Sequence, residues 1–121
     1  MLLGGFFTII DSELKENAIH GSLRINADHP IFRGHFPEVP VVPGVCMIQM
    51  VKEIVEENRG TSYGLTTGDN IKFLSVLNPL DHPEVGFMIE MDTNNNLAIT
   101  ASLFAGEVTF LKLKAVLAKH P

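Results

Sequence analysis

Apolar and polar residues alternate over much of the chain, which is the pattern of half-buried β-strands. The clearest case is the segment 85–92, in which one face carries Val85, Phe87, Ile89 and Met91. The segments 97–105 and 108–118 repeat this two-residue period, and turn residues at 94–96 and at Gly106 separate them. The pattern therefore predicts a meander of three antiparallel strands.

Three earlier segments, 6–10, 17–25 and 70–74, are also expected to be strands. The second has Ile19, Gly21, Leu23 and Ile25 on one face. The segment 26–44 contains four prolines and two glycines. Because proline fixes φ and lacks a backbone N–H, we expect this segment to be a stiff, irregular loop.

A helix is expected over about residues 45–58, after Pro43-Gly44 and before Arg59-Gly60. Its first half is apolar nearly all round, which predicts burial on every face. Its last turns, which contain Lys52, Glu53, Glu56 and Glu57, are expected to reach solvent. The chain is thus expected to form a single α+β domain over residues 1–121, with a curved antiparallel sheet wrapped round one long central helix.

Composition narrows the classes of function. With 45% hydrophobic residues, the chain has apolar surface to spare for a subunit interface or a lipid-like ligand. A net charge of −5, with scattered Lys and Arg, argues against nucleic-acid binding. No segment approaches the roughly 18 apolar residues that a membrane helix needs. The apolar start lacks the basic region of a signal peptide, so a cytoplasmic location is expected.

Candidate chemistry is concentrated in residues 34–45, where His35 lies in a proline-stiffened loop that leads into the helix. Free N–H groups at a helix start attract developing negative charge, so a thioester carbonyl placed there would be polarised. A histidine beside it is a suitable base for the adjacent carbon. The pattern permits this arrangement but equally permits a histidine that only hydrogen-bonds the loop.

The stretch G-H-F-P-x-x-P-x-x-P-G-V over residues 34–45 resembles the signature of the hot-dog 3-hydroxyacyl-[acyl-carrier-protein] dehydratases of bacterial fatty-acid synthesis. Residues 6–11, 70–74 and 78–81 resemble flanking parts of the same family. The resemblance implies a hot-dog fold and elimination of water from a 3-hydroxyacyl thioester to give the trans-2-enoyl thioester. It also implies an acyl-carrier-protein or coenzyme A substrate, no cofactor, and a homodimer or a higher assembly of dimers.

The resemblance also assigns roles to individual residues. His35 would remove the α-proton, the Gly44 N–H would polarise the thioester carbonyl, and the Val41 carbonyl would orient the imidazole. Further candidates for substrate contact are Phe36, Pro43, Val45 and Ile48. In a family dimer, the histidine of one subunit works with a helix acid of the other, fourteen positions after the histidine.

The chain departs from the family at that position, because residue 49 is Gln49. A carboxamide can hydrogen-bond a hydroxyl but cannot give it a proton. Glu53, one helical turn later, is either a substitute acid or a solvated carboxylate. We therefore expect a dehydratase with reduced activity. The alternatives are a non-catalytic acyl-thioester-binding subunit, or one that depends on a partner to supply the acid; a thioesterase is a weaker interpretation.

The remaining reactive side chains are expected to be structural. Cys46, the only cysteine, cannot form an internal disulfide and is interpreted as core packing rather than a nucleophile. The other histidines show no metal-ligand spacing and are interpreted as surface or loop residues. They are His20, His29, His82 and His120. No metal site is expected.

Overall fold

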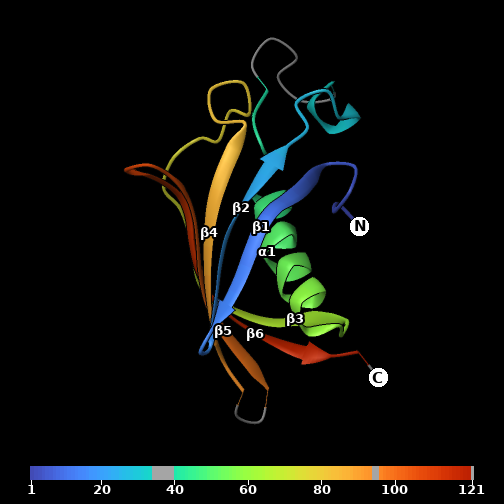
Figure 1. Ribbon diagram of the computed structural model, residues 1–121, viewed down its shortest axis with the longest axis vertical. Coiled ribbons are helices and arrows are strands. Elements are labelled where there is room, and N and C mark those ends of the chain that lie inside the picture. Colours follow the sequence, from blue (N-terminus) through green and yellow to red (C-terminus); the bar gives the residue numbers. More distant parts are fainter. Residues whose placement is uncertain (34–39, 94–95, 121) are drawn as a thin grey trace.

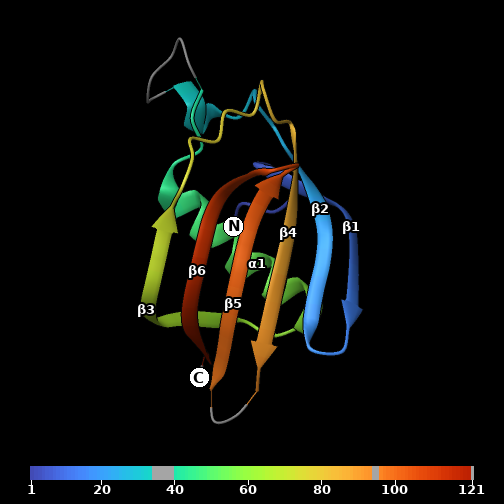
Figure 2. The ribbon, with the colours of Figure 1, turned by 90° about the vertical axis from the view of Figure 1, so that its left-hand side faces the viewer.

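The computed structural model describes residues 1–33, 40–93 and 96–120. Their strands form one six-stranded sheet in the order β1-β2-β4-β5-β6-β3, with every neighbouring pair antiparallel (Figure 2). The strands are β1 (Phe7–Lys15), β2 (Ala18–Ile25), β3 (Tyr63–Phe73), β4 (Glu84–Asp92), β5 (Leu97–Ala105) and β6 (Val108–Lys119). A 3-10 helix η1 (Pro30–Arg33) and the α-helix α1 (Gly44–Arg59) complete the described elements.

The sheet curves around α1, and the N-terminal segment lies on the same side of the sheet as the helix (Figure 1). The alternating apolar residues predicted for β2, β4, β5 and β6 face α1 and are almost all buried. The outer face of the sheet carries polar and charged residues, including Lys72, Glu90 and Lys112. The two-residue period of the sequence therefore maps directly onto the two faces of one sheet.

β3 is longer than the sequence pattern predicts, because it begins at Tyr63 rather than near residue 70. Its pairing with β6 shifts register twice, between Leu65 and Thr67 and between Gly68 and Asn70. Each shift interrupts the alternation of inward and outward side chains. The first half of the strand consequently lacks the apolar period by which strands are recognised in a sequence.

α1 begins after Pro43 and ends at Gly60, which has φ 64°, and the Gly60 N–H donates to the Glu56 carbonyl at 2.8 Å. A left-handed glycine of this kind is a common helix terminator. The predicted helix is confirmed, but the prediction of burial on every face is wrong at Val45, which is 75% exposed. Val45 lines a groove together with Leu65 of β3, and none of the described elements covers it.

Gly21 is a point of close approach within the sheet. A Cβ added there would overlap the Asp11 carbonyl oxygen and would lie 2.7 Å from the ring of Phe87. The β1–β2 register shifts beside this point, between Ile9 and Asp11. The absence of a side chain at residue 21 is therefore a condition of pairing β1, β2 and β4 as observed.

Gly21→Ala is expected to lower the free energy of unfolding by about 2 kcal/mol, since overpacking must displace the β1 backbone. Gly5→Ala is the matched control, because the nearest atoms to an added Cβ there are 3.9 Å away on His29. Urea denaturation of both variants measures the difference. Equal midpoints for the two variants would contradict the close approach at Gly21.

Candidate functional site

The start of α1 presents free backbone donors. Pro43 precedes the helix, and its carbonyl accepts hydrogen bonds from the N–H groups of Cys46 and Met47 at 3.0 and 3.2 Å. Among the described residues, no group accepts a hydrogen bond from the Gly44 N–H. The helix start therefore offers a donor to a carbonyl oxygen, supported by the positive end of the helix dipole.

The chain leading into the helix is fixed by one backbone contact. The Val42 N–H donates to the Leu77 carbonyl at 2.9 Å, and both side chains are buried. This bond ties the loop to the connection that follows β3. Val41 and Pro43, two of the predicted site residues, lie half-buried on either side of it. The predicted base His35 and its neighbour Phe36 lie outside the described residues.

Phe73, the last residue of β3, lies against the helix start. A Cβ added to Gly44 would come within 2.7 to 3.2 Å of the Phe73 ring, so the glycine makes room for that ring. About half of the Phe73 surface is exposed, 51%. Phe73 was not among the residues predicted for the site; the sequence pattern indicated only that it belongs to a strand over residues 70–74.

An apolar groove of about 270 Å³, which we call the helix–sheet groove, runs beside the exposed face of α1. Three of the predicted site residues, Val45, Ile48 and Gln49, lie in its wall. The other lining residues are Val51, Lys52, Leu65, Ile99, Leu113, Ala115 and Leu117. One wall is aliphatic sheet, and the other is a helix that adds the Gln49 amide and Lys52 to apolar side chains. The groove therefore suits a hydrocarbon chain that bears a polar group.

Glu53 is buried, with 1% of its surface exposed, so the expectation that it is solvated is wrong. Its Oε1 accepts hydrogen bonds from the N–H groups of Leu2 at 2.9 Å and Leu3 at 2.7 Å. Its Oε2 accepts from the same Leu2 N–H at 2.9 Å and from Gln49 Nε2 at 2.7 Å. The N-terminal segment thus supplies the partners that allow a helix carboxylate to be buried.

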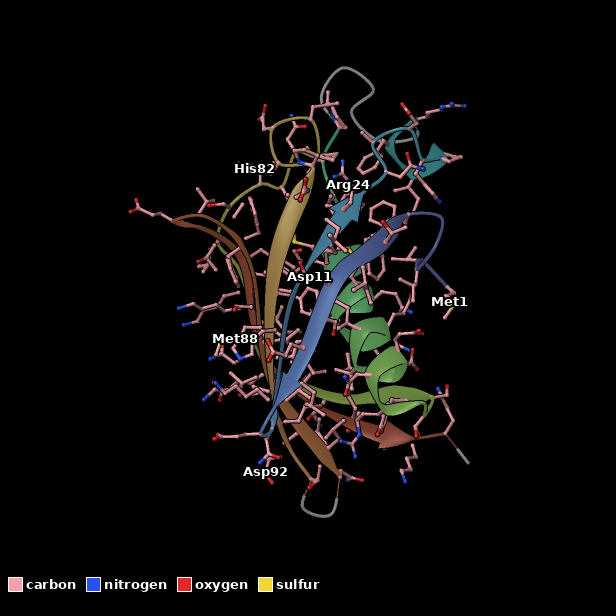
Figure 3. The ribbon with its side chains drawn as sticks, viewed as in Figure 1. Met1, Asp11, Arg24, His82, Met88 and Asp92 are labelled. Atoms are coloured by element: carbon pink, nitrogen blue, oxygen red, sulfur yellow. The ribbon has the colours of Figure 1, made fainter. Side chains whose placement is uncertain are left out.

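This arrangement could not be found from the sequence, because Leu2 and Glu53 are 51 positions apart and backbone donors leave no mark in the side-chain pattern. Met1 lies on the helix side of the molecule, whereas Met88 lies on the outer side of the sheet (Figure 3). Of the predicted site residues, Gln49 and Glu53 are brought together by their hydrogen bond. Gln49 lines the helix–sheet groove, but Glu53 does not.

Cys46 is buried in the core beside the helix start, as expected for a packing residue. Burial raises the pKa of its thiol, because desolvation disfavours the thiolate. The raised pKa opposes a nucleophilic role, since the thiolate is the reactive form.

Two other classes of site are absent from the described parts of the chain. Within residues 1–33, 40–93 and 96–120, no three His, Cys, Asp or Glu side chains group so as to hold a metal ion. No helix among these residues has both the length and the hydropathy needed to cross a membrane.

Comparison with known families gives a match over most of the chain. The model of the ApeI-like family, described as ApeI dehydratase, matches residues 11–108. The 3-hydroxyacyl-[acyl-carrier-protein] dehydratase FabZ of Thermoanaerobacter sp. (strain X514) is 32% identical over 90 residues, which are 68% of this chain and 62% of that protein. The FabZ of Anoxybacillus flavithermus (strain DSM 21510 / WK1) is 34% identical over 80 residues, 60% of this chain and 56% of the relative.

The chain therefore spans less than two thirds of the length of these curated relatives. Among solved structures, the dehydratase heterocomplex ApeI:P from Xenorhabdus doucetiae superimposes with a TM-score of 0.71 at 23% identity, covering 91% of this chain and 96% of that one. This similarity confirms the predicted hot-dog fold. Together with the family match over residues 11–108, it shows that the chain belongs to the ApeI-like dehydratase family of hot-dog proteins.

Proposed function

We propose that the protein eliminates water from a 3-hydroxyacyl thioester to give the trans-2-enoyl thioester. The observation that carries this proposal is the Gly44 N–H at the start of α1, which donates to no group among the described residues. Gly44 belongs to the motif over residues 34–45, and the next residue, Val45, lines the apolar groove. The acyl chain would lie in the helix–sheet groove. Its carrier would be an acyl-carrier protein, as in the names of the relatives, or coenzyme A.

In the proposed reaction, the thioester carbonyl accepts a hydrogen bond from the Gly44 N–H. The His35 imidazole then removes the α-proton, and the donor at Gly44 stabilises the resulting enolate oxygen. The 3-hydroxyl leaves as the carbon–carbon double bond forms, and it must gain a proton to leave as water. The Val41 carbonyl would hold the other ring nitrogen, and Phe36, Pro43, Val45 and Ile48 would contact the substrate.

The source of that last proton depends on residues 49 and 53. Gln49 cannot supply a proton, and the carboxylate of Glu53 is occupied by N–H donors. The proton can return from the His35 imidazolium, which balances the reaction without a second acid. Loss of a positioned general acid typically slows such a step by about 10²–10⁴, so we expect slow turnover.

A dimer formed through β3 fits the exposed apolar surface. β3 is an edge strand, paired only with β6 in the described sheet. Exposed apolar side chains lie along this edge and beside the helix start: Val45, Leu65, Phe73, Leu74 and Val76. An unpaired edge with apolar neighbours favours pairing with a second chain, and a second copy would cover the open side of the helix–sheet groove.

Gln49 supports a second candidate function, a subunit that binds acyl thioesters but depends on a partner for catalysis. In this case the second chain at the β3 edge would be a different hot-dog protein that carries the acid. This candidate predicts that the isolated protein binds acyl thioesters without eliminating water.

Gln49→Glu tests the two candidates. The new carboxyl group would face Glu53 across the position of a 2.7 Å contact, so the pair would hold one proton between them, as paired carboxylic acids do. We expect this variant to eliminate water about 10² faster than the wild type. The ultraviolet absorbance of the enoyl thioester measures the rate. Gln49→Leu, which supplies no proton, is the control.

The outcomes separate the candidates. A slow wild type with a faster Gln49→Glu variant supports dehydration by this chain. Inactivity of both, with binding retained, favours the partner-dependent subunit. High and equal rates for both would show that residue 49 has no part in proton transfer and would overturn the role given to it here.

A further inference from the structure

The amide of Gln49 has only one chemically sensible orientation. Its Nε2 lies 2.7 Å from Oε2 of Glu53. Both oxygens of Glu53 receive N–H donors, from Leu2, Leu3 and Gln49, as expected for a carboxylate that only accepts. An amide oxygen turned toward it would place two acceptors in contact. The NH₂ group of Gln49 must therefore face Glu53, and its Oε1 must face elsewhere.

Oε1 has no donor within the described chain and is not sealed from its surroundings. No hydrogen bond to it is present among residues 1–33, 40–93 and 96–120. No buried side-chain nitrogen or oxygen of the described residues lacks a partner, so Oε1 keeps an accessible surface. Gln49 lines the helix–sheet groove, where the residues beside it on the helix face are Val45, Ile48 and Lys52.

We propose that Gln49 is a specificity-determining residue that accepts a hydrogen bond from the 3-hydroxyl of the acyl chain, and that Glu53 is the positioning residue that enforces this polarity. The inference rests on the proposed function for the class of ligand. It adds that the site prefers a 3-hydroxyacyl chain to a 3-oxoacyl or an unsubstituted chain. A 3-hydroxyl donates to Oε1. A 3-oxo group, which only accepts, meets a second acceptor, and an unsubstituted chain leaves Oε1 without a partner.

The substitution Glu53→Gln should reverse the orientation of the Gln49 amide. The Leu2 and Leu3 N–H groups both donate to Oε1 of Glu53, so the amide oxygen introduced at position 53 must take the place of Oε1. The new NH₂ group then takes the place of Oε2, where the Leu2 N–H loses the second of its two acceptors and Gln49 is the neighbour that can accept. Gln49 then turns its own oxygen toward position 53 and presents NH₂ to the groove. An NH₂ group donates equally well to a 3-hydroxyl and to a 3-oxo oxygen, so the discrimination between them should disappear.

The test titrates three pantetheine amides of one chain length, bearing a 3-hydroxyl, a 3-oxo group or no 3-substituent, by calorimetry. The amide linkage replaces the thioester so that the weaker α-proton acidity prevents elimination during the titration. We expect the wild type to bind the 3-hydroxy compound about tenfold more tightly than the 3-oxo compound. In Glu53→Gln the two affinities should agree within about twofold.

Glu57→Gln makes the same chemical change one turn later at an exposed position, and it should keep the wild-type preference. Gln49→Leu gives a second route if Glu53→Gln fails to fold, because it removes the acceptor and leaves the bonds from Leu2 and Leu3 in place. We expect Gln49→Leu to bind the unsubstituted compound as the wild type does and to lose its preference for the 3-hydroxyl.

Each result decides the inference. The inference is overturned if the wild type binds the 3-hydroxy and 3-oxo compounds equally well. It is also overturned if Glu53→Gln keeps the wild-type preference for the 3-hydroxy compound. Where Glu53→Gln is unfolded, the same preference in Gln49→Leu overturns it. A general loss of affinity in Glu53→Gln with the hydroxy-to-oxo ratio intact would show that Glu53 is merely structural. Failure of the wild type to bind any of the three compounds would overturn the proposed function together with this inference. Binding without discrimination would overturn the inference alone.

Discussion

Replacement of Glu53 by alanine is expected to lower the free energy of unfolding by about 3 kcal/mol, a large fraction of the total for a domain of this size. The substitution removes the acceptor for the Leu2 and Leu3 N–H groups and for Gln49 Nε2 at once. Hydrogen bonds to a charged group are the stronger kind, and donors that stay buried without a partner carry a further cost. The N-terminal segment should detach from α1 in partial compensation.

Two measurements check this result. Urea denaturation gives the change in stability, and hydrogen exchange at the Leu2 and Leu3 amides shows whether the N-terminal segment has detached. Glu57→Ala is the matched control, because Glu57 is an exposed residue of the same helix. If Glu53→Ala and Glu57→Ala unfold at the same urea concentration, the buried carboxylate does not stabilise the fold.

Replacement of His35 by alanine is expected to reduce the elimination rate by about 10⁴, the upper end for loss of a general base. The effect should be large because, in the proposed mechanism, the imidazole both takes the α-proton and returns one to the leaving hydroxyl. Elimination from a 3-hydroxyacyl thioester by the complete chain, monitored as enoyl absorbance, measures the loss.

The control for His35→Ala is His20→Ala, which removes an exposed imidazole from β2. We expect His20→Ala to leave the rate unchanged. Comparable rates for the wild type and His35→Ala would exclude the histidine as the base, even if the protein is active. A parallel binding measurement ensures that the loss lies in turnover rather than in capture of the acyl chain.

Most strands and the helix could be predicted because each has a regular spacing of apolar residues along its own segment of the sequence. The alternation in β4, β5 and β6 predicted both their bounds and their buried faces. The apolar run after Pro43-Gly44 similarly predicted α1. In contrast, β3 was only half recognised, since its two register shifts break the period that defines a strand in sequence.

The environment of residues 49 and 53 could not be predicted in the same way. The sequence indicated that Gln49 lies one turn before Glu53, but the charged residues around Glu53 made a solvated carboxylate the natural expectation. Its burial depends on main-chain donors at Leu2 and Leu3, which any amino acid except proline would provide. A contact of this kind is specified by the course of the chain rather than by residue type.

The position of β3 next to β6 has a consequence for biosynthesis. β3 ends at Phe73, yet the strand with which it pairs begins only at Val108, and three of the residues that line the groove, Leu113, Ala115 and Leu117, belong to that last strand. During synthesis, β3 therefore leaves the ribosome before the strand with which it pairs. A nascent chain stopped before residue 108 would accordingly lack both the strand that pairs with β3 and the part of the helix–sheet groove that Leu113, Ala115 and Leu117 line.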